Sequence, residues 1–463
     1  MGRNATNLAY LVTIVAFIWA LRDLSNPATA LRGNRIGALG MLVAIVVTFS
    51  QKGLVSYWEI VVGMVIGGAF GAVAARRVKM TAMPQMVALF NGVGGGAAAL
   101  ISLAEFHRLA PAAGHLHGDV SAAVVLSALI GSVSFAGSML AFAKLQELVR
   151  GRPITYPGLQ VVNGLLFAGI LATGIAIVAG SERQWLLWAL VGGALVFGVL
   201  FVLPIGGADM PVVISLLNAF TGLAAAATGF ELENNVLIVS GMLVGASGTL
   251  LTLLMGRAMN RSIANVLFGA FGQVTAANAT AIAGADGGVR SATAEDVAVM
   301  LAYANRVSIV PGYGMAVAQA QHDVRQLADL LEAKGVEVSY AIHPVAGRMP
   351  GHMNVLLAEA NVPYPQLKEM GEANPEFART DVALVIGAND VVNPDARNNA
   401  GSPIYGMPIL NVDEAQTVVV LKRSMSPGFA GIDNPLFLNP KTVMLFGDAK
   451  ASINNLVQDV KAL

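Results

Sequence analysis

Nine long apolar stretches in the first 255 residues constrain the fold of this chain more than any other feature of its sequence. A helix of about 20 apolar residues is long enough to cross the roughly 30 Å of hydrocarbon in a bilayer. The sequence therefore predicts a polytopic α-helical membrane bundle with nine transmembrane helices. The stretches are centred on 6–21, 36–50, 54–75, 84–104, 120–143, 160–180, 184–203, 211–230 and 235–255, and the second is the shortest.

Composition agrees with a membrane protein, since 55% of the residues are hydrophobic and only 12% are charged. The net charge is zero and no basic patch is interleaved with aromatic residues, so a nucleic acid is not an expected partner. Cysteine is absent, which excludes disulfides, thiolate catalysis, Fe–S clusters and Cys-ligated zinc. The six histidines show no His-Glu-x-x-His spacing, so no metal site is expected.

Basic residues in the loops indicate which side of the membrane each loop occupies, because Lys and Arg concentrate in cytoplasmic loops. With the N-terminus outside, eleven basic residues fall on the inner side and four on the outer side, which predicts a cytoplasmic C-terminal domain. The inner set is Arg22, Arg32, Arg35, Arg76, Arg77, Lys79, Lys144, Arg150, Arg152, Arg257 and Arg261, and the outer set is Arg3, Lys52, Arg108 and Arg183.

The first apolar stretch also needs to be weighed against a signal peptide, since Ala28-Thr29-Ala30 resembles a cleavage site. Cleavage there would place Arg32 and Arg35 on the outer face and spoil the alternation of charge. A retained first helix is therefore predicted.

Several of the predicted spans carry glycine at four-residue spacing, as at Gly63, Gly67 and Gly71 and again at Gly241 and Gly245. The segment 91–96 reads Asn-Gly-Val-Gly-Gly-Gly. Small residues on one face let helix backbones approach closely in lipid, so these stripes predict a tightly packed bundle.

The last third of the chain has the composition of a soluble α/β domain. We expect a membrane domain over 1–256, a linker rich in Ala, Gly, Asn and Thr over 257–293, and a second domain over 294–463. Strands and helices alternate in this second domain, which predicts a Rossmann-like parallel sheet covered on both faces. Strands are expected at 306–310, 336–342, 382–387, 408–411, 417–421 and 442–446, and helices at 294–304 (capped by Thr293 and Asp296), 315–334, 351–360 and 449–461.

A glycine motif joins the first of these strands to its helix. Gly312, Gly314 and Val317 have the Gly-x-Gly-x-x-Val spacing of a dinucleotide-binding turn. Glycines let the backbone approach a pyrophosphate, and a helix N-terminus offers free N–H groups to it. Tight strand-to-helix turns also favour glycine, so the motif alone leaves both interpretations open.

The end of the second strand bears on which dinucleotide would bind. An NAD site places an acidic residue there, about twenty residues after the glycines, to accept from the ribose hydroxyls. This strand instead runs into His343-Pro-Val-Ala-Gly-Arg348, and Glu337 lies early in it. The ending favours a phosphorylated ribose or a cofactor that lies differently in the site.

Three later strand ends also carry polar residues. Lys422, Arg423 and Ser424 follow strand 417–421 and form a compact donor set for the 2′-phosphate of NADP, the alternative being a solvated strand end. Gly-Ala-Asn-Asp at 387–390 and Gly-Asp-Ala-Lys at 447–450 follow two more strands. Ligands of open α/β sheets bind at the carboxyl ends of strands, so one shared ligand is predicted.

These segments carry a resemblance to a known family. The stretches 312–321, 343–360, 386–390, 422–425 and 447–450 closely resemble the NADP(H)-binding domain of proton-translocating NAD(P) transhydrogenase. Gly-Gly-Ala-Asp-Met-Pro-Val-Val at 206–213 resembles its membrane domain. The likeness covers the whole chain, as the beta subunit.

The resemblance implies a reversible hydride transfer from NADH to NADP⁺, coupled to proton movement into the cytoplasm. NADP(H) would bind to this chain and NAD(H) to a partner, the alpha subunit, in one or two chains. It also implies a symmetric dimer of protomers in the cytoplasmic membrane of a bacterium. No side chain need act as a nucleophile, because the cofactors supply the chemistry.

By the same resemblance, specific residues would contact NADP(H). Lys422, Arg423 and Ser424 would hold the 2′-phosphate, and Asp390 near the nicotinamide would couple its redox state to protonation. Met425, Ser426, Pro427, Gly428 and Phe429 would form a lid, with Phe429 in place of a tyrosine often found there. The other expected contacts are Gly312, Tyr313, Gly314, Val317, Val345, Ala346, Gly347, Arg348, Met349, Pro350, Gly387, Ala388, Asn389, Val391, Gly406, Met407, Asp448 and Ala449.

The predicted proton path includes Asp209, a carboxylate between the seventh and eighth spans, where a charge is costly unless it is functional. Asn91, Asn163, Asn218 and Thr221 are the other deep polar side chains, and each also fits a role in helix packing. Some family members have a histidine where this chain has Asn91, whose amide does not titrate near neutral pH. The proton-binding group therefore lies elsewhere, or water carries the proton past this position.

Two other functions explain part of the sequence. A nucleotide-gated ion channel or antiporter predicts a row of charges inside the membrane, and apart from Asp209 the spans carry almost none. A non-catalytic NADP-binding subunit would be recognised by the lack of hydride exchange when the chain is mixed with its partner.

Overall fold

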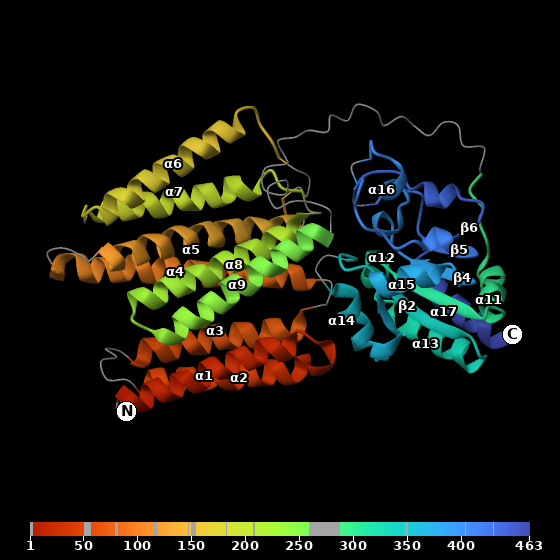
Figure 1. Ribbon diagram of the computed structural model, residues 1–463, viewed down its shortest axis with the longest axis horizontal. Helices are drawn as coiled ribbons and strands as arrows, with labels where there is room; N and C mark the ends of the chain where they lie inside the picture. The colour runs from red at the N-terminus through yellow and green to blue at the C-terminus, as the bar shows by residue number, and fades with distance from the viewer. Residues whose placement is uncertain are drawn as a thin grey trace. The chain divides into compact units, whose positions relative to one another are not determined.

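The computed structural model describes residues 3–50, 57–78, 82–113, 118–146, 148–149, 154–181, 183–206, 209–258, 288–347, 351–402, 404–428 and 430–463. Most of the predicted linker and the predicted loop residues Lys52, Lys79, Arg150 and Arg152 lie outside these ranges. The chain divides into two compact units, Met1–Leu253 and Leu254–Leu463, the first helical and the second built on a sheet (Figure 1).

The first unit confirms the predicted spans, because nine helices of the described residues are long and apolar enough to cross a membrane. Their bounds follow the apolar stretches, and the largest extensions are at the start of α2 and the end of α4. They are α1 Arg3–Leu24, α2 Pro27–Phe49, α3 Tyr57–Arg77, α4 Met83–Ala113, α5 Gly118–Leu145, α6 Leu159–Val178, α7 Gln184–Val202, α8 Met210–Glu231 and α9 Asn235–Ala258.

The second span, the shortest in the sequence, is a full helix because its polar start is paired with α1. Arg32 donates from Nε and Nη2 to the Asp23 carboxylate at 2.7 and 3.1 Å. A Cβ on Gly33 would lie 2.8 Å from the Ala20 carbonyl oxygen, so α1 and α2 form a close hairpin (Figure 1). The polar residues at the start of α2, which make its apolar stretch short in the sequence, thus connect α2 to α1.

Helix α5 is the centre of the bundle and packs against α4, α7 and α8. Glycine permits the closest approaches, since a Cβ on Gly95 would lie 2.9 Å from Gly131 O and one on Gly241 would lie 2.4 Å from Ala226 N. The glycine stripe of α3 is different, because Gly63, Gly67 and Gly71 contact no other helix among the described residues. The prediction of tight packing therefore holds for α4, α5, α8 and α9 but not for α3.

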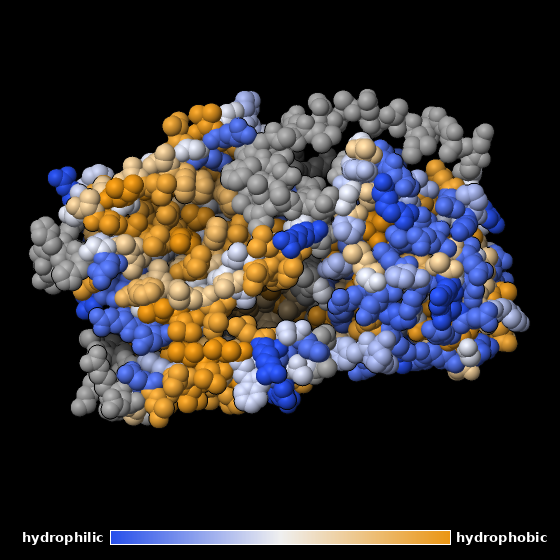
Figure 2. All heavy atoms as spheres, in the orientation of Figure 1, coloured by the Kyte–Doolittle hydropathy of each residue, from blue (hydrophilic) through white to orange (hydrophobic). Residues whose placement is uncertain are grey.

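The two units differ in surface chemistry (Figure 2). Apolar side chains such as Leu100, Leu165 and Ile175 are more than 60% exposed on the first unit. Such a surface is stable in lipid and not in water. The chain is therefore a multi-pass membrane protein, and the second unit has a predominantly hydrophilic surface.

The second unit contains one six-stranded, all-parallel sheet of order β3-β2-β1-β4-β5-β6. This is the order of a doubly wound dinucleotide-binding fold, with its switch point between β1 and β4. The main strands are Val- and Ile-rich runs buried on both faces, as central parallel strands require. Their bounds are β1 Arg306–Pro311, β2 Glu337–Ile342, β3 Leu367–Glu369, β4 Val382–Ile386, β5 Thr417–Lys422 and β6 Thr442–Phe446.

Helices cover both faces of the sheet. On one face, Ala373 and Phe377 of α15 share a buried cluster with Val310, Ala383 and Val385. Helices α11 and α13 pack on α17 as a second layer. The helices of this unit are α11 Ala294–Ala302, α12 Tyr313–Ala318, α13 Gln321–Ala333, α14 His352–Glu359, α15 Met370–Phe377, α16 Asp395–Asn398 and α17 Ala449–Ala462.

Most of the predicted elements of this unit are confirmed, including the reciprocal cap of α11 by Thr293 and Asp296. The single helix predicted over 315–334 is wrong, because Gln319 has a left-handed φ of 52° and separates α12 from α13. The strand predicted at 408–411 is also wrong, since this segment is not part of the sheet, although Leu410 N donates to Val391 O at 2.9 Å. The short β3 and α15, which contains Pro375, are not among the predicted elements.

Gly312→Ala is expected to destabilise the sheet domain by about 1–3 kcal/mol, since the new methyl group would lie 2.4 Å from the Ala388 backbone. Hydrogen exchange of the β1 and β4 amides measures the change in opening free energy. Gly371→Ala is the matched control, because this exposed helical glycine has open space around it and alanine should stabilise α15 slightly. Equal protection in the two variants would contradict a close backbone contact at Gly312.

Candidate functional site

The carboxyl ends of β1, β4 and β5 meet at one edge of the sheet and bring three predicted segments together. Gly312 N donates to Ile386 O at 2.9 Å, and Gly387 N donates to Leu421 O at 3.1 Å. The segment after β5 is Lys422-Arg423-Ser424. The structure therefore places the glycine motif, the 387–391 loop and the basic segment side by side, at the edge where open α/β sheets bind ligands.

The glycines of the motif serve a close contact between two backbones. Gly314 N donates to Gly387 O at 2.9 Å, and a Cβ on Gly314 would lie 2.7 Å from Gly387 Cα. Gly387 itself has φ 65°, a conformation that favours glycine. Val317 is 46% exposed on the six-residue α12. The glycines of the motif thus allow the chain after β1 to contact the chain after β4. Because α12 is so short, its dipole would interact only weakly with a phosphate.

The 387–391 loop is tied to the segment that follows β5. Asp390 Oδ2 accepts from Ala430 N at 2.8 Å, and a Cβ on Gly428 would lie 2.4 Å from Asp390 Oδ1. Asn434 Nδ2 donates to Asn389 O at 3.1 Å. The predicted lid, of which Met425–Gly428 are described and Phe429 is not, therefore lies directly against the loop that carries Asp390.

The basic segment offers two kinds of cation. Lys422 is half-buried, donates to Ser426 O of the lid, and lies 4.8 Å from the centre of the Phe437 ring. Burial lowers the pKa of Lys422, while Asp390 and Asp433 nearby oppose that shift. Arg423 and Ser424 are exposed, and Ser424 Oγ lies 2.9 Å from Ser426 Oγ. Arg423 is therefore the more accessible donor for an anion.

The loop after β2 is anchored by His343, which is 1% exposed. Its Nε2 lies 2.8 Å from Pro408 O, and its Nδ1 accepts from Val345 N at 3.3 Å, an arrangement that fits the neutral ring. Burial lowers the pKa of His343, against the opposing effect of the Pro408 carbonyl. The predicted contacts Val345, Ala346 and Gly347 follow it, whereas Arg348, Met349 and Pro350 lie outside the described residues.

Two further predicted segments have local structural roles. Gly406 has φ 79°, and Met407 packs with Ala430 against a small apolar cluster of Ala396, Ile404 and Ile409. Asp448, after β6, accepts from Lys450 N and Ala451 N at 3.0 and 3.3 Å and so caps α17, which begins at Ala449. The side chain of Asp448 is thus engaged by its own helix.

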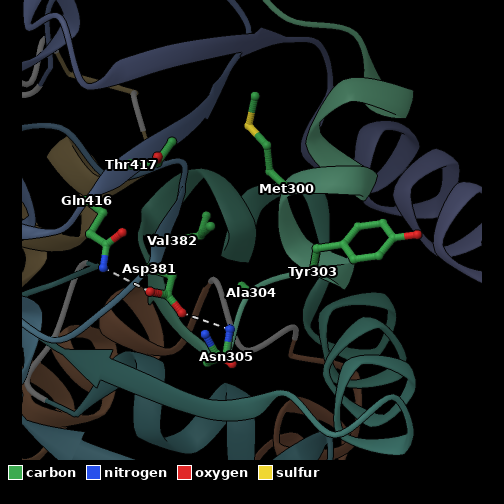
Figure 3. A pocket seen from close by; sticks show the side chains of 8 residues that line it. All are labelled: Met300, Tyr303, Ala304, Asn305, Asp381, Val382, Gln416 and Thr417. Carbon is green, nitrogen blue, oxygen red and sulfur yellow. Dashed lines mark hydrogen bonds between the residues drawn. The ribbon is translucent and has the colours of Figure 1, made fainter.

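A hollow of about 290 Å³ lies at the opposite edge of the sheet, between α11 and the starts of β4 and β5 (Figure 3). Asp381 accepts there from Asn305 N at 2.7 Å, Arg306 N at 3.0 Å and Gln416 Nε2 at 3.0 Å. Its carboxylate joins three chain segments, and ligands of this fold bind at the other edge. We assign no ligand to this hollow.

Inside the bundle, Asn91 of α4 is buried and connects to hydroxyl groups of α5 and α8. Its Nδ2 donates to Ser138 Oγ at 2.9 Å and to Ser134 Oγ at 3.3 Å. Ser134 Oγ in turn lies 2.5 Å from Thr221 Oγ1. Sequence reasoning names Asn91 and Thr221, and the structure adds Ser134 and Ser138, which a serine-containing apolar stretch does not single out.

The remaining predicted path residues lie elsewhere on α8. Asn218 is half-buried on it, and Asp209 precedes its first residue. Asn163 lies on α6, where it is half-buried. Two further carboxylates are buried near the ends of predicted spans, since Glu231 at the other end of α8 is 6% exposed and Glu105 of α4 is 8% exposed. Both residues fall just outside the predicted apolar stretches, so an inspection of charged residues within those stretches does not find them.

The chain is similar to known proteins over nearly its whole length. The family described as NAD(P) transhydrogenase beta subunit matches residues 6–459. The chain belongs to this family. Two relatives called NAD(P) transhydrogenase subunit beta, from Rhodospirillum rubrum and from a strain of that species, are each 50% identical over 463 residues, covering 99% of this chain and 99% of their own. The family resemblance in the sequence is thus confirmed, and the chain is similar in length to these beta subunits.

His343 predicts a specific pH dependence for this beta-subunit family member. Its folded pKa lies below the unfolded value of about 6.5, so the unfolded chain binds more protons between those two values. Stability contributed by the neutral ring is complete above about pH 6.5 and is lost as pH falls through the folded pKa. His343→Gln keeps an N–H donor for Pro408 O and should flatten the fall in hydrogen-exchange protection of the sheet domain between about pH 7.5 and pH 5.

The exposed His322 of α13 provides the control, since His322→Gln makes the same exchange of side chains at a position that is not buried. That variant should retain the wild-type pH slope. A wild-type slope in His343→Gln would show that the buried ring does not determine this dependence.

Proposed function

We propose that this chain is the NADP(H)-binding and proton-translocating subunit of a proton-pumping NAD(P) transhydrogenase. An alpha subunit, of one or two chains, would bind NAD(H), and hydride transfer between NADH and NADP⁺ would be coupled to proton movement. The assembly would be a dimer of protomers in a bacterial cytoplasmic membrane, with the N-terminus of this chain outside. The membrane domain would cover 1–256 and the cytoplasmic NADP(H) domain 294–463.

The observation that carries the proposal is the set of donors at the carboxyl end of β5, next to the switch point. Arg423, Ser424 and Lys422 supply two cations and a hydroxyl group, which suit a phosphate monoester. At the end of β2, the buried His343 stands where an NAD site has a carboxylate. A 2′-phosphorylated nucleotide therefore fits this edge better than an unphosphorylated one.

Bound NADP(H) would supply the hydride chemistry, and the residues of this chain would control access to it. The hydrogen bond from Ala430 N, directly after the predicted lid, to Asp390 joins the two sides of the site. Protonation of Asp390 would weaken this bond from the charge-assisted range of about 1.5–3 kcal/mol to the neutral range of about 0.5–1.5 kcal/mol and so favour release of the lid. In this way a proton arriving near Asp390 would change cofactor exchange.

Coupling requires that hydride transfer be blocked until a proton moves. A membrane potential supplies about 2.3 kcal/mol per proton per 100 mV, which is enough to drive a reaction between couples of similar potential. In the membrane domain, Asp209, Asn91 and Asn218 remain our candidates for the path. The hydrogen bonds of Asn91 to Ser134 and Ser138 on α5, and the contact of Ser134 with Thr221 on α8, support this choice.

Replacing both Lys422 and Arg423 by alanine should weaken NADPH binding by about a hundredfold or more, since each lost charge-assisted contact is worth about 1.5–3 kcal/mol. Binding of NADH, which lacks the 2′-phosphate, should hardly change. Titration of the purified full-length complex with each nucleotide measures both. Lys461→Ala, at an exposed lysine in the last turn of α17, is the matched control, and an unaltered NADPH affinity in the double variant would remove the phosphate assignment.

Asp209→Asn should slow proton-coupled turnover at least about tenfold while NADPH still binds, because an amide does not exchange a proton near neutral pH. Dye-monitored pumping by the complex in vesicles, measured beside NADPH affinity, tests this. Pumping at the wild-type rate would exclude a proton-carrying role for Asp209.

A further inference from the structure

Glu231, the last residue of α8, is a buried carboxylate that the proposed path above does not use. It is 6% exposed, and its Oε1 accepts from Ser102 Oγ of α4 at 2.8 Å. Its Oε2 is buried, the Ser127 hydroxyl of α5 lies beside the carboxylate, and no basic group of the described residues forms an ion pair with it. A carboxylate with so few donors is costly to bury as a fixed charge and is stable when it can take up a proton.

The contact with Ser102 suits both protonation states of Glu231. A serine hydroxyl has one proton and two lone pairs, and Ser102 Oγ has two acceptors in reach, Glu231 Oε1 at 2.8 Å and Ala98 O at 3.1 Å. When Glu231 is ionised, Ser102 donates to the carboxylate. When Glu231 is protonated, its O–H donates to Ser102 Oγ, and Ser102 turns its proton to Ala98 O. Rotation of one hydroxyl group therefore satisfies either state.

Glu231 also stands at one end of a series of hydroxyl groups. Ser127 of α5 lies beside it and is 2.7 Å from Thr228 Oγ1 on α8. Thr221 lies two helical turns before Thr228 on α8, a rise of about 10 Å. It contacts Ser134, which accepts a hydrogen bond from Asn91. Between Thr221 and Thr228 all residues except Leu223 are small, since 222 is glycine and 224–227 are alanine. Glu231 is thus the titratable group nearest to this series at the end of α8 opposite Asp209.

The charged groups around Glu231 are few. On α4, Glu105 lies close enough to interact with it, and Glu105 is itself paired with Arg108. Helix α5 carries Asp119 in its first turn and Lys144 in its last. Helix α9 has no charged residue between 235 and 256. A proton on Glu231 would therefore relieve its repulsion with Glu105.

We propose that Glu231 is a proton-binding site of the translocation path, at the opposite end of α8 from Asp209, and that it supplies the titratable group that Asn91 lacks. The inference rests on the proposed proton pumping. In the step, a hydronium ion at that end of the helix breaks one of its O–H bonds to give a proton to the Glu231 carboxylate, which forms an O–H bond and leaves a neutral water. That O–H bond then breaks as the proton passes to a water or hydroxyl oxygen deeper in the bundle, which releases a proton of its own to the next acceptor, and the carboxylate is regenerated.

Glu231→Gln in the full alpha–beta complex tests this inference with two measurements. Pumping into vesicles should fall about tenfold or more, and Glu231→Asp should restore part of it, while NADPH affinity stays unchanged. In pH-difference infrared spectra of the complex in lipid, the carbonyl band of one protonated carboxylic acid should be missing from Glu231→Gln and shifted in Glu231→Asp. Glu233→Gln, two residues away at an exposed glutamate, should match the wild type in both measurements.

The outcomes separate this inference from the proposed function. Wild-type pumping together with an unchanged infrared spectrum in Glu231→Gln would overturn the role of Glu231 and leave the pump intact. A wild-type complex that exchanges hydride without pumping would overturn the proposed coupling itself. If Glu231→Gln does not assemble, the Glu231→Asp spectrum decides, because an unshifted band excludes Glu231 as its source.

Discussion

The approach of two backbones at the switch point of the sheet determines where the candidate site lies. Gly312 and Gly314 contact Gly387 and Ala388 so closely that a single methyl group on either strand end would collide with main-chain atoms. This contact directs the loop that carries Asp390 toward the end of β5. The basic segment and the lid then lie against that loop, and the chemistry of the site depends on them.

One result of this arrangement is that the donors predicted to hold a phosphate are not equally available. Lys422 already contacts the lid through Ser426 O and lies near Asp390, whereas Arg423 is exposed. An incoming anion would meet Arg423 first. Lys422 has three N–H donors, so it could contact the anion while it still donates to Ser426 O. The same lysine would thereby join a bound anion to the predicted lid.

The parts of the fold that the sequence predicts are those with a strong periodic or compositional signal. Hydropathy gives nine spans, and β-branched runs bounded by glycine give five of the six strands. The break at Gln319 has no such signal, since a left-handed φ at a non-glycine residue depends on how α12 and α13 pack. The apolar segment 408–411 resembles a strand, but it is buried beside Val391 without a ladder partner.

In the candidate site too, some features can be predicted from the sequence and others cannot. The residues that follow each strand can be read from the sequence. Because parallel strands bring their carboxyl ends together, these residues are predicted to lie at one site. The contact of Asp390 with Ala430 joins residues 40 apart, and that of Ser102 with Glu231 joins residues 129 apart. No local pattern encodes such distances. Glu231 is hidden further because it ends an apolar span, where a polar residue is expected in any case.

Helix α8 connects these points in the membrane. From Asp209 to Glu231 the chain rises about 33 Å, close to the thickness of the hydrocarbon core, so one helix has a carboxylate near each end. Between them, α4, α5 and α8 provide amides and hydroxyls, which pass hydrogen bonds on but do not hold a charge near neutral pH. A path of this kind needs titratable groups at its ends and not at its middle. Asparagine at residue 91 is then compatible with proton conduction, because its amide has only to orient neighbouring hydroxyls or water.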